Sequence, residues 1–310
     1  MSQNLVAIRL DSMTRSAYAF IDSMDPPDIF NAHRGRLFGI AYRMLGSRAD
    51  AEDILQETYL RWIDAKPSEL RSPEGWLVTV VTRLCIDRLR SAKAEREAYI
   101  GTWLPEPLVS TEPSSPDRAV ELAHDISIAF LTVLERLAPE ERAAFLLREV
   151  FDFDYAEISR VIGKNQVACR QIVHRAKQRV QEDRPLFSVS REAHRRLLEK
   201  FIVAASSGTR EQIIGMLADE VRVTSDGGGR VPAFRKLVQG SDRVARFYAH
   251  LGRKFAGRSV YRLAEINGAP GVLRYVDEKL ESAQSFVIDG AQICAIYIVR
   301  NPEKLSHIPI

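Results

Sequence analysis

The sequence predicts a multidomain protein in which two all-α domains are followed by an α+β domain. Apolar residues recur at helical spacing in residues 28–96 and again in residues 118–181. Residues 97–117 between them contain four prolines, each of which removes an amide donor and disfavours helix in the residue before it. From residue 258 onward β-type runs dominate, and Asp289-Gly290 lies between two of them as a hairpin signal. Helices followed by a meander of strands indicate an α+β domain.

We expect the chain to divide at these changes of pattern. The expected segments are a leader at 1–25 (in which Met13 and Met24 leave the start open), a first helical domain at 26–96, a linker at 97–117, a second helical domain at 118–184 with a helix-turn-helix at 155–180, and a C-terminal domain at 191–310.

Composition limits the class of protein. The chain has 310 residues, of which 45% are hydrophobic and 27% are charged, as in ordinary globular proteins. No apolar run approaches the length of a membrane span, and the N-terminus lacks the apolar core of a signal peptide, so we expect no membrane partner. The three cysteines are far apart, which argues against a disulfide framework or a zinc site and fits the reducing cytoplasm. We expect no metal and no cofactor.

Charge is distributed unevenly along the chain. Residues 1–190 hold 25 Lys and Arg and 28 Asp and Glu, a net charge of −3, whereas residues 191–310 hold 19 and 13, a net charge of +6. Residues 158–181 hold six Lys and Arg and no acidic residue. This stretch is therefore a basic island in a slightly acidic half, and bulk composition does not account for it.

Three helices are expected in the first domain. The first ends at Gly46, Ser47 caps the second, and Ser72-Pro73 starts the third, because proline needs no amide partner at the first helical position. The inward residues are Phe30, Leu37, Ala41, Met44 and Leu45 in the first helix, Ala51, Ile54, Leu55, Thr58 and Trp62 in the second, and Leu77, Val80, Val81 and Leu84 in the third.

The basic island reads as a helix-turn-helix. Asp154 and Glu157 form an acidic capping box, Gly163 allows a sharp turn, and Asn165 can cap the second helix. The expected buried residues are Ile158, Val161 and Ile162 in the first helix and Cys169, Ile172, Val173, Ala176 and Val180 in the second.

The opposite face of that second helix carries Gln166, Arg170, His174 and Lys177. Arg reads guanine, Gln reads adenine and Lys neutralises phosphate, so this face has the chemistry to enter a major groove. Val167 lies off the buried stripe and can touch a thymine methyl. The alternative is a solvated helical hairpin with a basic face.

In the C-terminal domain we expect helices at 191–206, at 210–218 and at 242–254. Thr209 and Gln212 have the spacing of a capping box for the second of these helices, and Ser241 can cap the third.

Candidate acid–base residues in this domain are Asp226, His250, Asp277 and Glu278, but no pair of them has a diagnostic spacing. The run "DGGGR" at 226–230 lacks the Lys-Ser/Thr ending of a phosphate-binding loop. It predicts either a tight turn or a close approach of the backbone to another surface.

Two long segments carry a family resemblance. The segment "FNAHRGRLFGIAYRMLGSRADAEDILQETYLRWI" resembles region 2 of sigma-70 family factors of the extracytoplasmic-function type, and "FLTVLERLAPEERAAFLLREVFDFDYAEISRVIGKNQVACRQIVHRAKQRV" resembles their region 4. Together the two cover about residues 28–181, in the family's order. The motifs "WLPEP" at 103–107, "DGGGR" at 226–230 and "NPEKL" at 301–305 look like those of factors with a C-terminal SnoaL-like extension, a cone-shaped α+β fold of the nuclear-transport-factor-2-like superfamily.

The resemblance implies a polymerase-binding face on the second helix. Asp50, Asp53 and Glu57 lie on one helical face, which suits a basic partner. The alternative is a solvated acidic face. The residues implied to dock on the clamp helices of the polymerase β′ subunit are Asp50, Glu52, Asp53, Gln56 and Glu57.

The resemblance also implies two promoter contacts. Helix 74–96 would recognise and help to melt the −10 element, with Trp76 in the core and Asp87 orienting an arginine. Its cations are Arg83, Arg88, Arg90, Lys93 and Arg96, of which Arg83, Arg88 and Arg90 are taken as DNA-binding. The helix-turn-helix would read the −35 element through Lys164, Asn165, Gln166, Val167, Arg170, Gln171, His174, Arg175 and Lys177.

The three short motifs are expected to be regulatory contacts. The linker would thread into the polymerase channels or pack against the C-terminal domain, and the two C-terminal motifs would contact the linker or the sigma body. The residues concerned are Trp103, Leu104 and Pro105, then Asp226, Gly227, Gly228, Gly229 and Arg230, and finally Asn301 and Pro302.

The sequence therefore predicts an RNA polymerase sigma factor of extracytoplasmic-function type. It would bind core polymerase through the β′ clamp helices and the β subunit, and direct it to promoter DNA. The C-terminal domain would modulate transcription in cis and would not be an enzyme. It could bind a small-molecule ligand. Two alternatives stay open: a DNA-binding protein fused to a small-molecule enzyme, and a DNA-bound regulator without polymerase contact.

Overall fold

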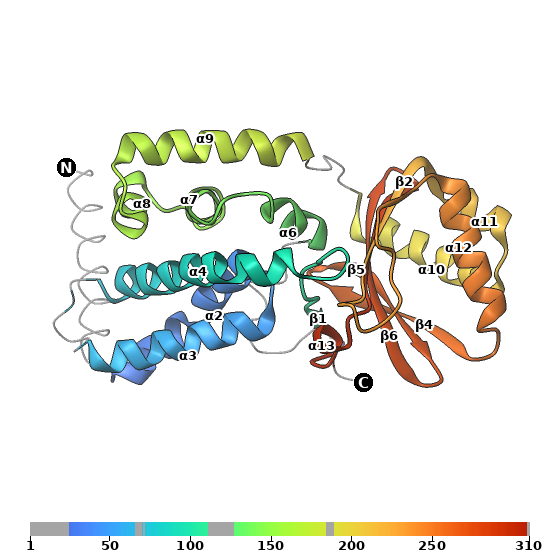
Figure 1. Ribbon diagram of the computed structural model, residues 1–310, viewed down its shortest axis with the longest axis horizontal. Coiled ribbons are helices and arrows are strands. Elements are labelled where there is room, and N and C mark those ends of the chain that lie inside the picture. The colour runs from blue at the N-terminus through green and yellow to red at the C-terminus, as the bar shows by residue number, and fades with distance from the viewer. Residues whose placement is uncertain (1–24, 66–69, 71, 111–126, 184–188, 309–310) are drawn as a thin grey trace, which may run out of the picture.

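The computed structural model describes residues 25–65, 70, 72–110, 127–183 and 189–308. A helical part and an α+β part lie side by side (Figure 1). The expected leader, except Asp25, and parts of the linker and of the joint before residue 191 lie outside the described residues. The helices of the helical part are α2 (Pro26–Leu45), α3 (Arg48–Asp64), α4 (Pro73–Glu97), α6 (Ile128–Leu134), α7 (Pro139–Glu149), α8 (Tyr155–Ile162) and α9 (Gln166–Asp183).

Helices α2, α3 and α4 form the first helical unit. Gly46 ends α2 in the left-handed region at φ 65°, and the Ser47 hydroxyl accepts the Asp50 N–H to cap α3, as predicted. Ser72 caps α4 in the same way. The predicted apolar stripes of α2 and α3 are buried, and the Trp62 and Trp76 rings lie 5.7 Å apart.

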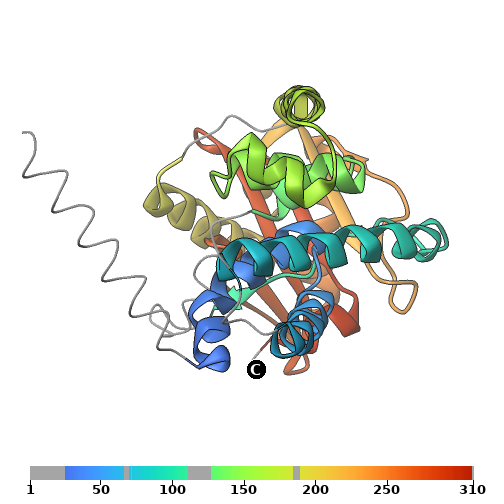
Figure 2. The ribbon, with the colours of Figure 1, turned by 90° about the vertical axis from the view of Figure 1, so that its left-hand side faces the viewer.

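Helices α6 to α9 form the second helical unit, which rests on the first. Helices α7 and α8 both pack against α4, and α7 also packs against α2. Figure 2 shows the second unit stacked on α4 with the sheet behind it. The predicted capping box of Asp154 and Glu157 is confirmed, and Gly163 makes the turn at φ 68°. The stripe from Cys169 to Val180 is buried, so the helix-turn-helix has the predicted inner face.

The C-terminal domain packs helices on one face of a mixed sheet. In the described residues the strand order is β1-β4-β5-β6-β7-β2-β3, antiparallel except for the parallel pair β2 and β7. The elements are α10 (Arg191–Ser207), α11 (Arg210–Ile214), β2 (Leu217–Asp226), β3 (Val238–Gln239), α12 (Ser241–Lys254), β4 (Ser259–Ile266), β5 (Ala269–Val276), β6 (Lys279–Asp289), β7 (Gln292–Val299) and α13 (Pro302–Leu305).

The predicted fold class, two all-α units followed by an α+β domain, is confirmed, with local corrections. The second helix of this domain ends at Ile214 rather than 218, and Thr209 makes no side-chain cap. Gly240, not Ser241, precedes α12. The predicted hairpin joins β6 to β7, but Asp289 still pairs with Gln292, so the turn is Gly290-Ala291.

The linker belongs to both halves of the molecule. Its strand β1 (Val109–Ser110) pairs with β4 at the edge of the C-terminal sheet. The sheet face opposite the helices contributes Leu273, Tyr275 and Val299 to the core that contains the helical units. The two halves therefore share one hydrophobic core, while α10 to α12 close a second one on the other face. Within the described residues, no helix has the length and apolar character to cross a membrane.

Candidate nucleic-acid interface and the interdomain clasp

The outer face of α9 is accessible. The predicted −35 residues from Lys164 to Lys177 are all exposed, and Val167 has 61% of its surface exposed. The Asn165 side chain accepts the Ala168 N–H at 2.8 Å, so it caps α9. The Arg170 guanidinium lies 5.2 Å from the Tyr155 ring centroid, and Lys177 pairs with Glu149 at 2.7 Å.

The predicted −10 cations on α4 have intramolecular partners. Arg83 donates to the carbonyls of Val161 and Arg160 at 3.0 and 2.9 Å, and so caps the C-terminus of α8. Arg90 pairs with Glu140 of α7. The Asp87 carboxylate also lies 3.3 Å from Arg90, and so orients this arginine as predicted.

Arg88 is engaged within the first unit. Its Nε donates to Asp50 at 3.0 Å, and its Nη1 lies 3.3 Å from Glu95. One predicted DNA-binding residue therefore pairs with one predicted polymerase-binding residue.

A buried arginine joins the two helical units. Arg142 of α7 donates to the Met44 carbonyl at 2.6 Å and to Glu135 at 2.7 Å. Glu135 also pairs with Arg96 of α4. Burial lowers the pKa of both guanidinium groups, and Glu135 supplies the negative charge that they share.

The acidic face of α3 is also accessible. Asp53 and Gln56 are exposed, Glu52 pairs with Arg34 at 2.7 Å, and Glu57 pairs with Arg61 at 2.9 Å. A groove of about 420 Å³ opens beside them between α2 and α3. Phe30 and Leu55 of the predicted buried stripes line this groove, together with Tyr59 and Leu60. Sequence reasoning missed Tyr59, Leu60 and the exposed Ile63, whose signal is that they are apolar residues off the buried stripe.

The linker, the turn at 226–230 and α13 meet in a contact that we call the clasp. At its centre Asp226 is fully buried. Its carboxylate accepts hydrogen bonds from four donors, which are the Tyr99 hydroxyl at 2.6 Å, the Leu104 N–H at 2.9 Å, the Gly228 N–H at 2.9 Å and the Lys304 ammonium at 2.7 Å.

The linker tryptophan lies between two cations. Arg96 of α4 is 4.2 Å from the Trp103 ring centroid, and Lys304 of α13 is 4.1 Å from it. Such contacts stabilise a desolvated cation. Burial lowers the pKa of Lys304, and the facing Asp226 opposes that shift.

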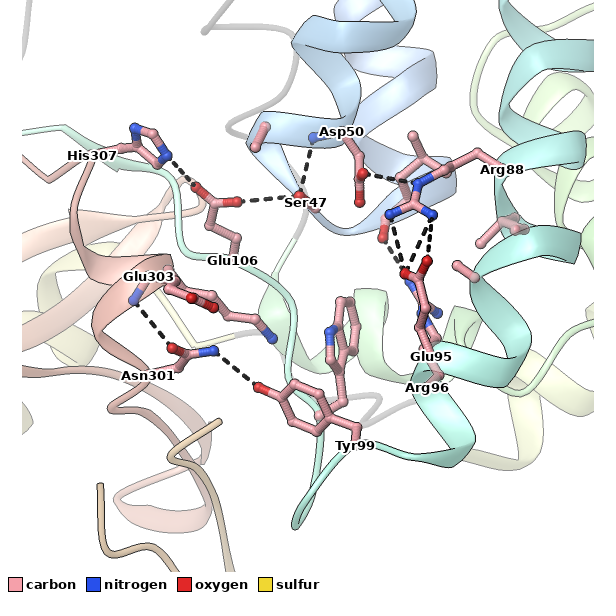
Figure 3. Close-up of a pocket in the computed structure, with 16 residues that line it drawn as sticks. Ser47, Asp50, Arg88, Glu95, Arg96, Tyr99, Glu106, Asn301, Glu303 and His307 are labelled. Atoms are coloured by element: carbon pink, nitrogen blue, oxygen red, sulfur yellow. Dashed lines mark hydrogen bonds and ion pairs between the residues drawn. The ribbon is translucent and has the colours of Figure 1, made fainter. Parts of the chain in front are cut away.

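The glycines of the 226–230 turn allow a close approach to α13. Gly228 has φ 63°, and a Cβ on it would lie 2.5 Å from the Asn301 side-chain nitrogen. Asn301 caps α13 and donates to the Tyr99 hydroxyl at 3.1 Å, as Figure 3 shows. Arg230 pairs with Glu303, and Pro302 is exposed at the first position of α13.

A second set of polar contacts ties the linker to α2 and to the start of α3. The Glu106 carboxylate accepts the Arg48 N–H at 2.8 Å, and the Tyr42 hydroxyl donates to the Glu106 carbonyl at 2.8 Å. Asn267, in the β4–β5 turn, donates to the Tyr42 hydroxyl at 2.7 Å. Sequence reasoning missed these residues, together with Tyr99 and Lys304, although Glu106 and Lys304 lie within the quoted motifs.

The candidate acid–base residues are not brought together. Asp226 is in the clasp, His250 is exposed on α12, and Asp277 pairs with Arg258 at the β5–β6 turn, next to Glu278. In the described part of the chain, no group of three or more His, Cys, Asp and Glu side chains could hold a metal ion.

Known proteins resemble this chain over most of its length. Residues 29–95 match the family model of sigma-70 region 2, and residues 127–180 match that of sigma-70 region 4. The ECF RNA polymerase sigma factor SigJ of Mycobacterium tuberculosis is 37% identical over 294 residues, which cover 91% of this chain and 93% of that protein. The probable ECF sigma factor SigI of the same species is 32% identical over 89% of this chain and 93% of that protein.

A solved structure extends the likeness to three dimensions. The crystal structure of M. tuberculosis SigJ has a TM-score of 0.74 and 33% identity, covering 89% of this chain and 97% of that one. The likeness thus includes the C-terminal α+β domain as well as the two helical units. The chain belongs to the extracytoplasmic-function sigma factors of the sigma-70 family, in a form that carries a C-terminal α+β extension.

Proposed function

We propose that this sigma factor divides its contacts among three helices. The exposed face of α9 reads the −35 element in the major groove, α4 engages the −10 element, and the acidic face of α3 docks on the β′ clamp helices of core polymerase. The accessibility of α9 and α3, and the run of arginines along α4, support these roles.

We further propose that the compact arrangement is a resting form. The observation that carries this proposal is that the Arg83 guanidinium donates hydrogen bonds to the last carbonyls of α8. Helix α8 belongs to the helix-turn-helix that we propose reads the −35 element. Arg90 is likewise paired with Glu140 in that unit. These cations reach a promoter strand only when the second unit leaves α4, so promoter binding requires the two units to separate.

The C-terminal domain would set this balance in cis. The clasp holds α4, the linker and α13 around Asp226. Because these partners belong to one chain, their effective concentration is about millimolar and weak contacts suffice. The scattered acid–base candidates argue for a regulatory domain and not an enzyme.

Transcription with purified core polymerase tests the proposal. The full chain should start transcripts from its own promoter, which is found by using a library of genomic fragments as templates. A regulator without polymerase contact would bind DNA but start no transcripts. A DNA-binding protein fused to an enzyme would also start none, but it would convert a small-molecule substrate.

We expect Arg170→Ala to weaken specific promoter binding by about 1–3 kcal/mol, the usual contribution of a bidentate base contact. Lys164→Ala, at another exposed cation of the same motif, should weaken binding to all DNA sequences about equally and flatten the salt dependence of binding. Fluorescence anisotropy with promoter and random duplexes at several salt concentrations measures both. Equal losses on the two duplexes for Arg170→Ala would mean that it contacts phosphate alone.

Ending the chain at Arg300 should raise transcription several-fold, because it removes α13 and with it the Lys304 and Asn301 contacts of the clasp. Ending it at Asp183 removes the whole extension, including any contacts needed for correct spacing, and should change transcription by a different amount. Run-off transcription with purified polymerase compares them. If both match the full chain, the extension does not regulate.

A further inference from the structure

The outer face of α12 carries basic side chains and no carboxylate. At helical spacing, five residues fall within an arc of about 100°, and they extend over about 17 Å of the helix. They are Arg243, Arg246, His250, Arg253 and Lys254, and all five are exposed. The buried residues of α12 lie on the opposite side of the helix.

Most of these cations have no anionic partner within the chain. Asp242 is the only acidic residue of α12, and it pairs with Arg246 at 2.6 Å. Among the described residues, Arg243, Arg253 and Lys254 form no ion pair. Three positive charges on one side of the helix are therefore available to a partner.

Helix α10, which packs beside α12, has the charge pattern of an ordinary solvated helix. Its Arg195 lies 3.3 Å from Glu199, and its Arg196 lies 3.8 Å from Glu192, in both cases four residues apart. Such pairs balance the charge on an exposed helical face. The same domain thus balances its cations on α10 and leaves them unbalanced on α12, which indicates a negatively charged partner for α12.

The loop before β3 adds two more cations to this side of the domain. The Phe234 ring packs against Phe247 of α12, with ring centroids 4.8 Å apart. Arg235 and Lys236 follow Phe234 directly in the chain, and both are exposed. Within the described part of the chain neither of them forms an ion pair. We call these two residues and the five on α12 the basic surface.

The position of the basic surface favours DNA as its partner. Helix α12 covers the sheet face opposite to the core that the two halves share, so it lies on the outside of the molecule (Figure 1). Asp183 ends α9 and Arg191 starts α10, eight residues later, and eight residues span at most about 28 Å. A duplex bound by α9 therefore passes close to the C-terminal domain, and each of its strands presents a phosphate about every 3.4 Å along the helix axis.

We propose that the basic surface is a further DNA contact of this factor, which binds the phosphate backbone beside the segment that α9 holds. The proposal rests on the proposed role of α9 as a DNA reader. Lysine and arginine that neutralise phosphates add affinity for any sequence and carry no base readout. The contact thus gives the C-terminal domain a direct part in holding promoter DNA, separate from the clasp.

The salt dependence of DNA binding tests the proposal. The probe is a random-sequence duplex about four helical turns long, and fluorescence anisotropy measures its affinity for the full chain at several salt concentrations. The triple variant Arg243→Gln, Arg253→Gln and Lys254→Gln should bind at least about tenfold more weakly at low salt. The slope of log affinity against log salt concentration should fall by about 2 to 3, since each phosphate contact contributes about 0.9.

The matched control replaces Arg191, Arg195 and Arg196 of α10 by Gln. It removes the same charge from the same domain, but these three arginines have carboxylate partners within the chain. The control should leave the salt slope nearly unchanged. A thermal melt followed by circular dichroism checks that both triple variants keep the fold.

An unchanged salt slope in the α12 variant would overturn the proposal. An equal change in the α10 control would do so too, because the effect would then follow from net charge alone. If the α12 variant loses binding to phosphatidylglycerol vesicles and keeps its salt slope on DNA, the basic surface binds a membrane instead. The role of α9 fails separately, because unchanged promoter binding in Arg170→Ala would remove the base contact of α9 and leave the effect of the α12 variant on random DNA in place.

Discussion

Replacing Asp226 by Asn should lower the free energy of unfolding by about 3–5 kcal/mol, because removing one partner of a buried ion pair leaves the other charge without compensation. Asp226 is fully buried, and the Lys304 side chain facing it has 12% of its surface exposed. The Asn side chain has only one oxygen to accept hydrogen bonds from the four donors. Its N–H₂ group faces the donors that the second carboxylate oxygen had accepted from. The whole clasp should therefore loosen.

Urea unfolding followed by circular dichroism measures the loss, and hydrogen exchange in α13 locates it. The matched control is Glu303→Gln, which breaks the Arg230 pair on the same turn. That pair is 64% and 61% exposed, so its loss should cost less than about 1 kcal/mol.

The double variant Asp226→Asn with Lys304→Met should recover much of the loss, because it removes the uncompensated charge and keeps an apolar stem against Trp103. If Asp226→Asn lowers the free energy of unfolding no more than Glu303→Gln does, the clasp does not depend on the buried ion pair.

Features that depend on near neighbours in the chain could be predicted from the sequence. The Asp154–Glu157 capping box and the turn at Gly163 are set by residues within a few positions of each other. The buried stripes of α3 and α9 follow from helical spacing alone. The exposed face of α9 follows from the same spacing, so the residues assigned to the −35 reader could be placed on one surface.

Features that depend on distant partners could not be predicted. Strand β2 pairs in parallel with β7, about seventy residues later, and the sequence around 215–218 continues a helical pattern that this pairing overrides. The hydrogen bonds of Arg83 could not be predicted for the same reason, because its acceptors are backbone carbonyls, which every residue carries. The motif around Asp226 indicated a contact surface, but its partners Tyr99 and Lys304 lie 127 residues before it and 78 residues after it in the chain.

Reversing both Asp53 and Glu57 to Lys should abolish retention of core polymerase, weakening binding by at least about a hundredfold, because like charges brought together at an interface cost several kcal/mol. Both side chains lie on one face of α3, beside the groove between α2 and α3 and the exposed Leu60. Neither is buried, and the Glu57–Arg61 pair is about half exposed, so the fold should lose less than about 1 kcal/mol.

A pull-down with purified core polymerase measures retention, and a thermal melt followed by circular dichroism checks the fold. The matched control reverses Glu192 and Glu199 on α10, which changes the net charge equally and, for Glu199, breaks a similar exposed pair with Arg195. That control should retain polymerase normally. If the α3 variant does so too, the acidic face of α3 is a solvated surface, and the docking site lies on another part of the first helical unit.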